Sequence, residues 1–317
     1  ARAACETVFQ IQLGDATRLS SLGIEANTDI AFSPDEKYLA IGTHLGDIWV
    51  VDSYSGDLQA KAHFAEGMVK FVRWSNDGAI LYAAEQSPDA NLYALNPEDL
   101  TVEWTISLAD IVESSPLQPG EDVYGVYSLP AAYGLNVLEN GDLIVTAAHG
   151  WGPFGGGRRN LSQILRLNPQ GKITHRWPKE PASTIMKHPS INEETEQIAL
   201  ILSRSADEDE PENTPPRGVQ LLNLTDLSPI NHLSPNPLEP YFSTADIWDA
   251  FTLKNSLLMG LVDGRVMNTT PDGQSIWEIT PTTPMMAGDV PIHASIGWGD
   301  WLNDGVIFTT SVTYIPF

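Results

Sequence analysis

Short apolar stretches separated by turn signals recur along most of the chain. In residues 29–42, two such stretches flank the turn Ser33-Pro34-Asp35-Glu36. A third stretch, 46–52, follows, and a fourth ends near Phe64 after a second turn. Short apolar runs bounded by Ser, Pro, Asp and Gly are typical of strands joined in antiparallel hairpins. The pattern predicts a sheet of four antiparallel strands within roughly 35 residues, which is the size of one propeller blade.

The same unit recurs further along the chain. A second copy spans 69–106 around the turn Ser75-Asn76-Asp77-Gly78, and a third spans 133–177 around the turn Glu139-Asn140-Gly141-Asp142. Later copies are looser and lie in 185–223, 250–279 and 294–310. Self-similarity at a regular spacing is typical of repeat folds, in which each unit is one supersecondary element.

The two ends of the chain are expected to share one blade. The last copy has only two predicted strands, whereas the segment 7–14 resembles an outer strand with no partner before it. Pairing this segment with the C-terminal strands would close the ring and hide two sheet edges. We therefore predict an all-β propeller of about six four-stranded blades, forming a single domain over residues 1–317. The count becomes seven if 109–130 contains a degenerate copy.

On these features the sequence resembles the WD40-like and quinoprotein-like β-propeller families. The resemblance rests on the Ser33-Pro34-Asp35 turn, on the strand ending Leu167-Asn168-Pro169-Gln170-Gly171, and on three tryptophans, Trp104, Trp177 and Trp277. It implies an architecture and no particular activity. The spacing from turn to tryptophan varies between copies, so a bound quinone is not carried over, and no cofactor is required. We expect the tryptophans to pack between blades.

Glycines at four positions, 78, 141, 171 and 273, are expected to form turns. Each follows a polar residue between two apolar stretches, where the backbone needs a positive φ. No predicted helix follows any of these glycines, so they do not form phosphate-binding loops.

The charge balance excludes two classes of partner. Against 17 Lys and Arg, the 41 Asp and Glu leave a formal charge of −24. Such a surface repels phosphate backbones and anionic headgroups, so nucleic-acid and membrane-surface binding are not expected. No apolar run approaches the length of about 20 residues that membrane insertion requires. The acidic surface favours solubility, and it could attract cations or a basic partner.

The N-terminus suggests a protein that has been exported. The sequence begins at Ala1 without Met, which is typical of a chain whose targeting segment has been removed. Cys5 is the single cysteine, so no intrachain disulfide can form. Ala3-Ala4-Cys5 looks like a lipoprotein cleavage site, but Arg2 and the residues that precede the cysteine argue against lipidation. We expect a periplasmic or extracellular location.

The insertion after the second strand of the third copy is the principal candidate binding site. Residues 149–160 combine aromatic rings, a glycine run and an adjacent arginine pair. The candidate ligand-binding residues are His149, Trp151, Phe154, Arg158 and Arg159. Paired arginines beside aromatic rings suit a carboxylate, a sulfate or a sugar. The alternative is a glycine-rich loop that crosses the blade while its arginines neutralise nearby carboxylates.

A second insertion, 207–216, is the candidate metal site. Asp207, Asp209 and Glu210 could hold Ca²⁺ through carboxylate oxygens, although the spacing differs from that of an EF-hand. A like-charged run containing prolines is also typical of a solvated loop. A third insertion, 109–130, is expected to be a covering loop.

Three functions remain open. The leading interpretation is a non-catalytic binding or scaffold propeller, which recognises a protein partner or a small anionic ligand through loops on one face. A divalent-cation-dependent hydrolase or lyase is the first alternative, with Asn136, Asp246 and Asp249 as candidate ligands at the channel mouth. A subunit of a larger assembly, docking through the proline-rich stretch 228–240, is the second. The sequence lacks a nucleophile elbow, and its seven histidines show no metal-ligand spacing.

Overall fold

The described residues are almost entirely β-structure. The computed structural model describes residues 19–20, 23–24, 27–113, 128–151, 159–203, 215–233, 247–261, 264–280, 285–287, 290–292, 295–302 and 305–311. Within these ranges the strands are antiparallel to their neighbours, and one short helix, α1 (Ala109–Val112), is present. The strand periodicity read from the sequence therefore identifies the secondary structure correctly.

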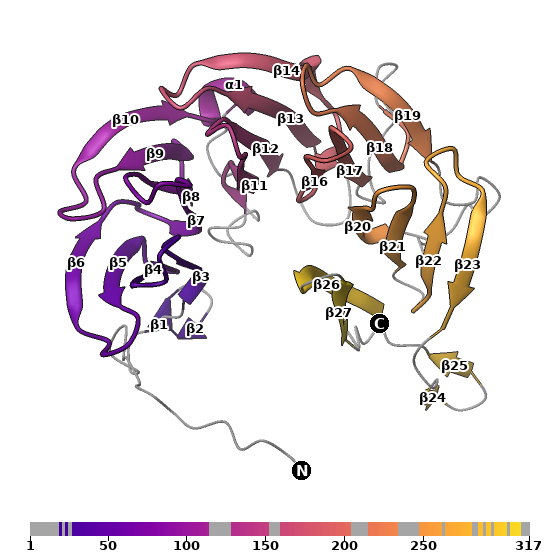
Figure 1. Ribbon diagram of the computed structural model, residues 1–317, viewed down its shortest axis with the longest axis horizontal. Helices are drawn as coiled ribbons and strands as arrows, with labels where there is room; N and C mark the ends of the chain where they lie inside the picture. Colours follow the sequence, from indigo (N-terminus) through magenta and orange to yellow (C-terminus); the bar gives the residue numbers. More distant parts are fainter. Residues whose placement is uncertain are drawn as a thin grey trace. The chain divides into compact units, whose positions relative to one another are not determined.

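Three four-stranded units follow one another in the first part of the chain (Figure 1). The first sheet contains β3 (Asn27–Phe32), β4 (Tyr38–Thr43), β5 (Asp47–Asp52) and β6 (Leu58–His63). The second contains β7 (Met68–Trp74), β8 (Leu81–Gln86), β9 (Asn91–Leu95) and β10 (Val102–Ser107). The third contains β11 (Ala131–Val137), β12 (Leu143–Trp151), β13 (Arg159–Leu167) and β14 (Ile173–Ala182). Ala131 of β11 also pairs with Gln86 of β8, which joins the second and third sheets.

The remaining strands form two further sheets and three small pairs. The fourth sheet contains β15 (Ile185–Met186), β16 (Ser190–Asn192), β17 (Gln197–Ser203), β18 (Gly218–Asn223) and β19 (Pro229–Leu233). The fifth contains β20 (Ile247–Thr252), β21 (Leu257–Leu261), β22 (Val266–Thr269) and β23 (Ser275–Ile279). The pairs are β1 (Leu19–Ser20) with β2 (Gly23–Ile24), β24 (Met285–Ala287) with β25 (Val290–Ile292), and β26 (Ser295–Leu302) with β27 (Gly305–Ser311). The segment 7–14 lies outside the described residues, so closure of the ring stays a prediction.

The chain divides into two compact units. The first comprises Ala1–Ser183 with Asp207–Asp209, and the second comprises Thr184–Ala206 with Glu210–Phe317. The first, second and third sheets belong to the first unit, and the fourth and fifth sheets belong to the second.

Polar side chains fold the predicted turns. Ser75 Oγ donates to Asp77 Oδ1 over 2.7 Å and accepts from the Ile80 amide over 2.9 Å, which closes the turn between β7 and β8. Ser33 makes the same two contacts in the first sheet. The four predicted turn glycines all have positive φ, as at Gly78 with φ 73°. The turns rich in Pro, Asp and Gly therefore have the side-chain hydrogen bonds and positive φ angles that such residues favour.

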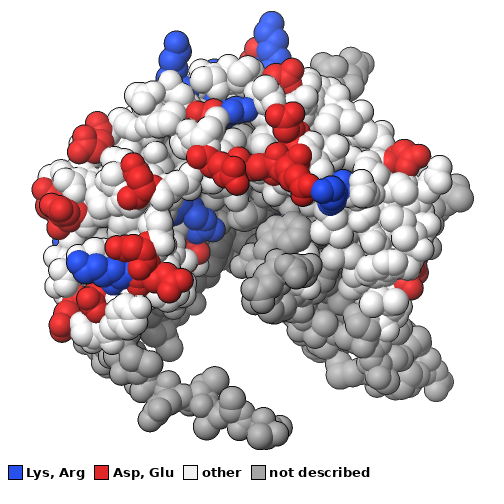
Figure 2. Space-filling view, in the orientation of Figure 1, with Lys and Arg blue, Asp and Glu red and all other residues white. Residues whose placement is uncertain are grey.

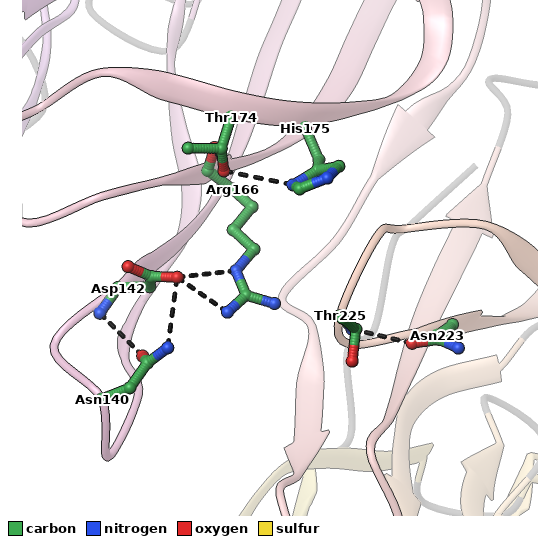
Figure 3. A network of polar contacts seen from close by, with 7 residues as sticks. All are labelled: Asn140, Asp142, Arg166, Thr174, His175, Asn223 and Thr225. Carbon is green, nitrogen blue, oxygen red and sulfur yellow. Dashed lines mark hydrogen bonds and ion pairs between the residues drawn. The ribbon is translucent and has the colours of Figure 1, made fainter.

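An ion pair fixes the corresponding turn of the third sheet (Figure 3). Arg166 on β13 donates from Nε to Asp142 Oδ2 over 2.8 Å, and its Nη2 lies 2.7 Å from the same oxygen. Asn140 holds the other side of the turn, because its Oδ1 accepts from the Asp142 amide over 2.9 Å. Both charged side chains are largely buried, so the pair ties the β11–β12 turn firmly to the third strand.

Neighbouring sheets of the first unit pack face to face. Ala40, Ile48 and Val50 of the first sheet form one core cluster with Val72 and Trp74 of the second. Polar contacts complete this junction. Trp74 Nε1 donates to the carbonyl oxygen of Ala31 over 2.9 Å, and Asp29 Oδ2 accepts from the Val72 amide over 3.0 Å. A second cluster joins the second and third sheets and includes Tyr82, Leu135, Val145 and Leu165.

The outer-strand tryptophans do not all behave alike. Trp104 on β10 packs between sheets as predicted, and its Nε1 donates to the carbonyl oxygen of Pro169 in the third sheet over 3.1 Å. Trp277 on β23 is 41% exposed, so the packing prediction is wrong for this residue. All of β23 is exposed, whereas Trp104 lies against a neighbouring turn whose glycine leaves room for the indole.

Candidate binding site at the loop end of the second and third sheets

Connections of different length leave the two ends of each sheet. In the five sheets, turns of a few residues join the first strand to the second and the third strand to the fourth. The longer connections, 108–130, 152–158, 204–217 and 234–246, join a second strand to a third or one sheet to the next. Because the strands are antiparallel, all these longer connections leave a sheet where its first strand begins. We call this end of a sheet its loop end and the opposite end its turn end.

A β-bulge recurs near the loop end of the first strands. The pairing register shifts by one residue at Thr28 in β3, at Lys70 in β7, at Tyr133 in β11 and at Trp248 in β20. A bulge places an extra residue on one strand and re-aims its side chain. In the first unit, the first strands therefore present Thr28, Lys70 and Tyr133 at matching positions of three successive sheets. Thr28 Oγ1 donates to the carbonyl oxygen of Val69, next to the bulge of the following sheet.

Lys70 and Tyr133 contact each other across the junction of the second and third sheets. Lys70 Nζ lies 3.5 Å from the centroid of the Tyr133 ring. Within the described ranges, no carboxylate pairs with this ammonium group. Burial lowers the pKa of Lys70 to about 7, because the charged amine loses hydration and gains no anion in return. A buried lysine with no anionic partner can bind a group that accepts a hydrogen bond or carries a negative charge.

Buried polar side chains hold the end of the connection 108–130 at the same junction. On β12, His149 follows Val145 and Ala147 at two-residue spacing, so it lies on the face that packs against the second sheet. Its Nε2 lies 3.2 Å from the carbonyl oxygen of Ser128, so this nitrogen carries the proton and donates it. On β8, Gln86 likewise donates from Nε2 to the carbonyl oxygen of Leu129 over 3.0 Å.

An aromatic surface adjoins these contacts. The His149 ring is buried and stacks on the partly buried Trp151 ring, with centroids 4.4 Å apart and planes inclined by 25°. Gln86 is also fully buried, and its Oε1 has no hydrogen-bond partner in the part of the chain that the structure describes. A buried acceptor of this kind usually has a partner, such as water or a ligand. The junction thus combines an aromatic stack, an amide oxygen and a lysine.

A second buried amide lies on the other face of β13. Asn160 pairs with Gly150, so its side chain lies on the face opposite to His149 and Trp151. The side chain is 1% exposed, and both its Oδ1 and its Nδ2 lack partners among the described residues. Leaving such a group unsatisfied costs about 1–3 kcal/mol, so Asn160 also marks a place for bound water or a polar ligand.

Glu85 shapes the short β8–β9 connection at this loop end. Its buried carboxylate accepts from Ser87 Oγ over 2.7 Å, from the Asn91 amide over 2.9 Å and from Tyr93 OH over 3.2 Å. Burial raises the pKa of Glu85, although these hydrogen bonds oppose the shift. The satisfied oxygens indicate that Glu85 has a structural role in positioning the connection.

The same architecture occurs in solved structures of known proteins. The chain matches the Dos1 propeller with a TM-score of 0.57 and 15% identity, covering 92% of this chain and 66% of that one. It matches the C-terminal WD40 domain of Sif2 with a TM-score of 0.56 and 14% identity, covering 90% and 65%. A computationally designed protein, Ika8, matches with a TM-score of 0.55 and 12% identity, covering 90% and 68%. No family model and no curated protein matches the sequence.

The fold is a WD40-like β-propeller. The chain spans about two thirds of the length of these matched structures. The predicted all-β propeller is thereby confirmed, and each four-stranded sheet is one blade, while the number of blades and the closure of the ring stay predictions. At these levels of identity the likeness concerns architecture only. In the described residues, no helix is long and apolar enough to cross a membrane.

The propeller brings together part of the predicted ligand-binding set. His149 and Trp151 are in contact, as described above, and Arg159 begins β13. Phe154 and Arg158 lie outside the described residues, and so do the candidate Ca²⁺ ligands Asp207, Asp209 and Glu210. The described residues contain no group of three or more His, Cys, Asp or Glu that could hold a metal ion. Of the alternative channel ligands, Asn136 lies in β11 and Asp249 in β20, while Asp246 is outside the described part.

Sequence reasoning missed several groups at the second–third blade junction. Lys70, Gln86 and Ser128 carry no motif. Lys70 contacts Tyr133, Gln86 pairs with Ala131 and donates to Leu129, and Ser128 contacts His149, so each contact joins segments that are distant in the sequence. Alignment of the repeated copies is the one sequence signal that could have identified Lys70. Its place in the second copy corresponds to that of Tyr133 in the third, so alignment of the copies would have matched the two residues.

Proposed function

We propose that this propeller is a non-catalytic binding scaffold whose partner is a protein, held at the loop end of the second and third blades. The observation that carries the proposal is the Lys70–Tyr133 contact at the junction where His149, Trp151 and Gln86 also gather. Binding residues are concentrated on loops, and the longer connections leave the blades at their loop ends. The fold itself is compatible with many functions.

Each group at this site has a role in the proposed recognition. Trp151 offers aromatic area at low cost in side-chain entropy, and its stacking on buried His149 fixes its orientation. Lys70 donates to a carboxylate or carbonyl oxygen of the partner, and this contact restores the charged form that burial disfavours. Gln86 is fully buried and donates to the carbonyl oxygen of Leu129, so its role is to position the residues that precede β11.

The surrounding charge limits which partner fits. On the face drawn in Figure 2, Asp and Glu side chains outnumber Lys and Arg side chains, in keeping with the formal charge of −24. A strongly acidic partner would be repelled over a distance of about 8 Å at physiological ionic strength. The proposed partner is therefore neutral or basic overall and brings a single acceptor to Lys70.

Matched lysine variants test the proposal. Affinity capture from an extract of the source cells would use the wild type, Lys70→Gln, Trp151→Ala and Lys172→Gln. Lys172 is an exposed lysine in the β13–β14 turn, so its substitution makes the same charge change at the turn end. We expect the wild type and Lys172→Gln to recover one protein in common, and Lys70→Gln and Trp151→Ala to lose it while keeping their circular dichroism spectra.

Two outcomes would contradict this assignment. Equal recovery by all four proteins would place the partner elsewhere on the chain. Alternatively, small carboxylates could raise the Tm of the wild type and not that of Lys70→Gln, with no protein recovered. That result would assign the site to a small anionic ligand.

A further inference from the structure

A cavity of about 470 Å³ lies between the first and second blades, within the first unit. Its walls include Ser33, Asp35 and Tyr38 from the β3–β4 region, Trp74 and Asp77 from the β7–β8 region, and Glu98 from the β9–β10 turn. These turns are at the turn ends of the two blades, so the cavity is separate from the proposed partner site. Its volume lies within the range of ligand pockets, about 300–1,000 Å³.

Hydrogen bonds favour the ionised form of two of these carboxylates, Asp35 and Asp77. A hydrogen bond from Ser33 Oγ, together with one from the Lys37 amide, lowers the pKa of Asp35. A hydrogen bond from Ser75 Oγ, together with one from the Ala79 amide, lowers the pKa of Asp77. Each of these contacts uses Oδ1, and within the described residues the Oδ2 atoms of both aspartates have no partner.

Aromatic rings form another part of the wall. Trp74 is 8% exposed, and its indole is fixed by the bond from Nε1 to the carbonyl oxygen of Ala31. Tyr38 is partly buried, and Lys37 Nζ lies 4.7 Å from its ring centroid. Lys37 therefore lies beside Tyr38, and its charge also acts on Asp35. Lys37 is not among the residues that line the cavity, and no other basic residue lines it either.

We propose that this cavity binds an arginine side chain from a basic segment of a protein partner. Three carboxylates with no lining cation attract a positive group, and aromatic faces stabilise it further. A guanidinium group suits the site better than an ammonium group. Its planar fork reaches two carboxylates at once and stacks on Tyr38 or Trp74. Asp35 and Asp77, from equivalent turns of successive blades, supply the two acceptors.

The test uses the whole protein and a defined peptide. The probe is acetyl-Gly-Gly-Arg-Gly-Gly-amide, and its control is the same peptide with citrulline, which keeps the shape and removes the charge. Binding is followed by calorimetry and by the indole N–H resonance of Trp74 in ¹⁵N-labelled protein. We expect saturable binding of the arginine peptide with a shift of that resonance, and at least about tenfold weaker binding of the citrulline peptide.

Matched variants locate the binding. Asp35→Asn with Asp77→Asn removes two charges and keeps the oxygens that accept the turn hydrogen bonds, so this variant is expected to fold. Glu66→Gln with Glu103→Gln removes two charges from exposed positions that do not line the cavity. We expect the first pair to weaken binding by about tenfold or more, and the second pair by less than about twofold.

Three results would overturn the assignment. These are no saturable binding at millimolar peptide, equal losses from the two variant pairs, and equal binding of the citrulline peptide. Binding of ethylguanidinium as tightly as the peptide would overturn the protein segment as the ligand and assign the cavity to a small cation.

Discussion

The contact of Trp104 with Gly171 makes a quantitative prediction about packing between blades. Gly171 has φ of 78°, and a Cβ atom at this position would lie 2.8 Å from two atoms of the Trp104 indole. Gly171→Ala therefore has two consequences. The residue is forced to keep a left-handed backbone, at about 1–2 kcal/mol. The indole must also move, which endangers its hydrogen bond to Pro169, worth about 0.5–1.5 kcal/mol.

Gly78→Ala provides the matched control. Its φ of 73° imposes similar backbone strain, but its Cβ would meet only Pro34 Cδ at an ordinary distance of 3.5 Å. We expect Gly171→Ala to lower the free energy of unfolding by about 2–3 kcal/mol and Gly78→Ala by about 1–2 kcal/mol. The difference between the two variants measures the contact between the second and third blades.

Urea unfolding followed by circular dichroism checks the prediction. In a Trp104→Ala background, Gly171→Ala should cost no more than Gly78→Ala, because the indole is no longer in the way. Equal losses for the two glycine variants in the wild-type background would refute the reasoning. So would an unchanged cost of Gly171→Ala after removal of Trp104.

Three further predictions concern charged groups. Asp29→Ala should lower the free energy of unfolding by about 1.5–3 kcal/mol, because it removes hydrogen bonds to the second blade. Glu194 forms an exposed ion pair, so Glu194→Ala should change this free energy by less than about 1 kcal/mol; urea unfolding measures both. The pKa of Glu85 is raised in the folded state, so its contribution to stability is complete below the ordinary pKa of 4.5 and is lost as the pH rises through the folded-state pKa. Glu85→Gln should therefore gain stability relative to wild type as the pH rises. An unchanged difference in the free energy of unfolding between the two proteins from pH 4 to pH 8 would contradict this. The rate of acylation of Lys70, followed by peptide mass spectrometry with exposed Lys179 as the comparison, should reach half its plateau near pH 7; a rate that still rises steeply above pH 9 would contradict it.

Local sequence chemistry predicted most of the blade structure. The turns at Ser33 and Ser75 and the glycines with positive φ are determined by a few neighbouring residues, so they can be read from short segments. The first three blades have tight turns between regular apolar stretches, and their strands match the prediction closely. The fourth blade was harder, because its first strand is divided into β15 and β16, which both pair with β17.

Contacts between distant segments limit how much of the candidate site can be predicted from the sequence. The aromatic pair of His149 and Trp151 was within reach of the sequence, because the two residues are neighbours on one strand. The contact of His149 with Ser128 and the contact of Lys70 with Tyr133 join residues more than 20 positions apart, which no local pattern encodes. The same holds for the cavity between the first two blades, where the repeated turns were recognised as structural elements and their facing carboxylates were not.

Site-specific photocrosslinking tests the central claim that the loop end of the second and third blades holds a protein partner. A photoreactive phenylalanine analogue would replace either Trp151 at the loop end or Trp277, an exposed tryptophan on an outer strand. After irradiation in an extract of the source cells, we predict one protein adduct from position 151 and none of that protein from position 277. Adducts with the same protein from both positions, or from position 277 alone, would contradict the claim.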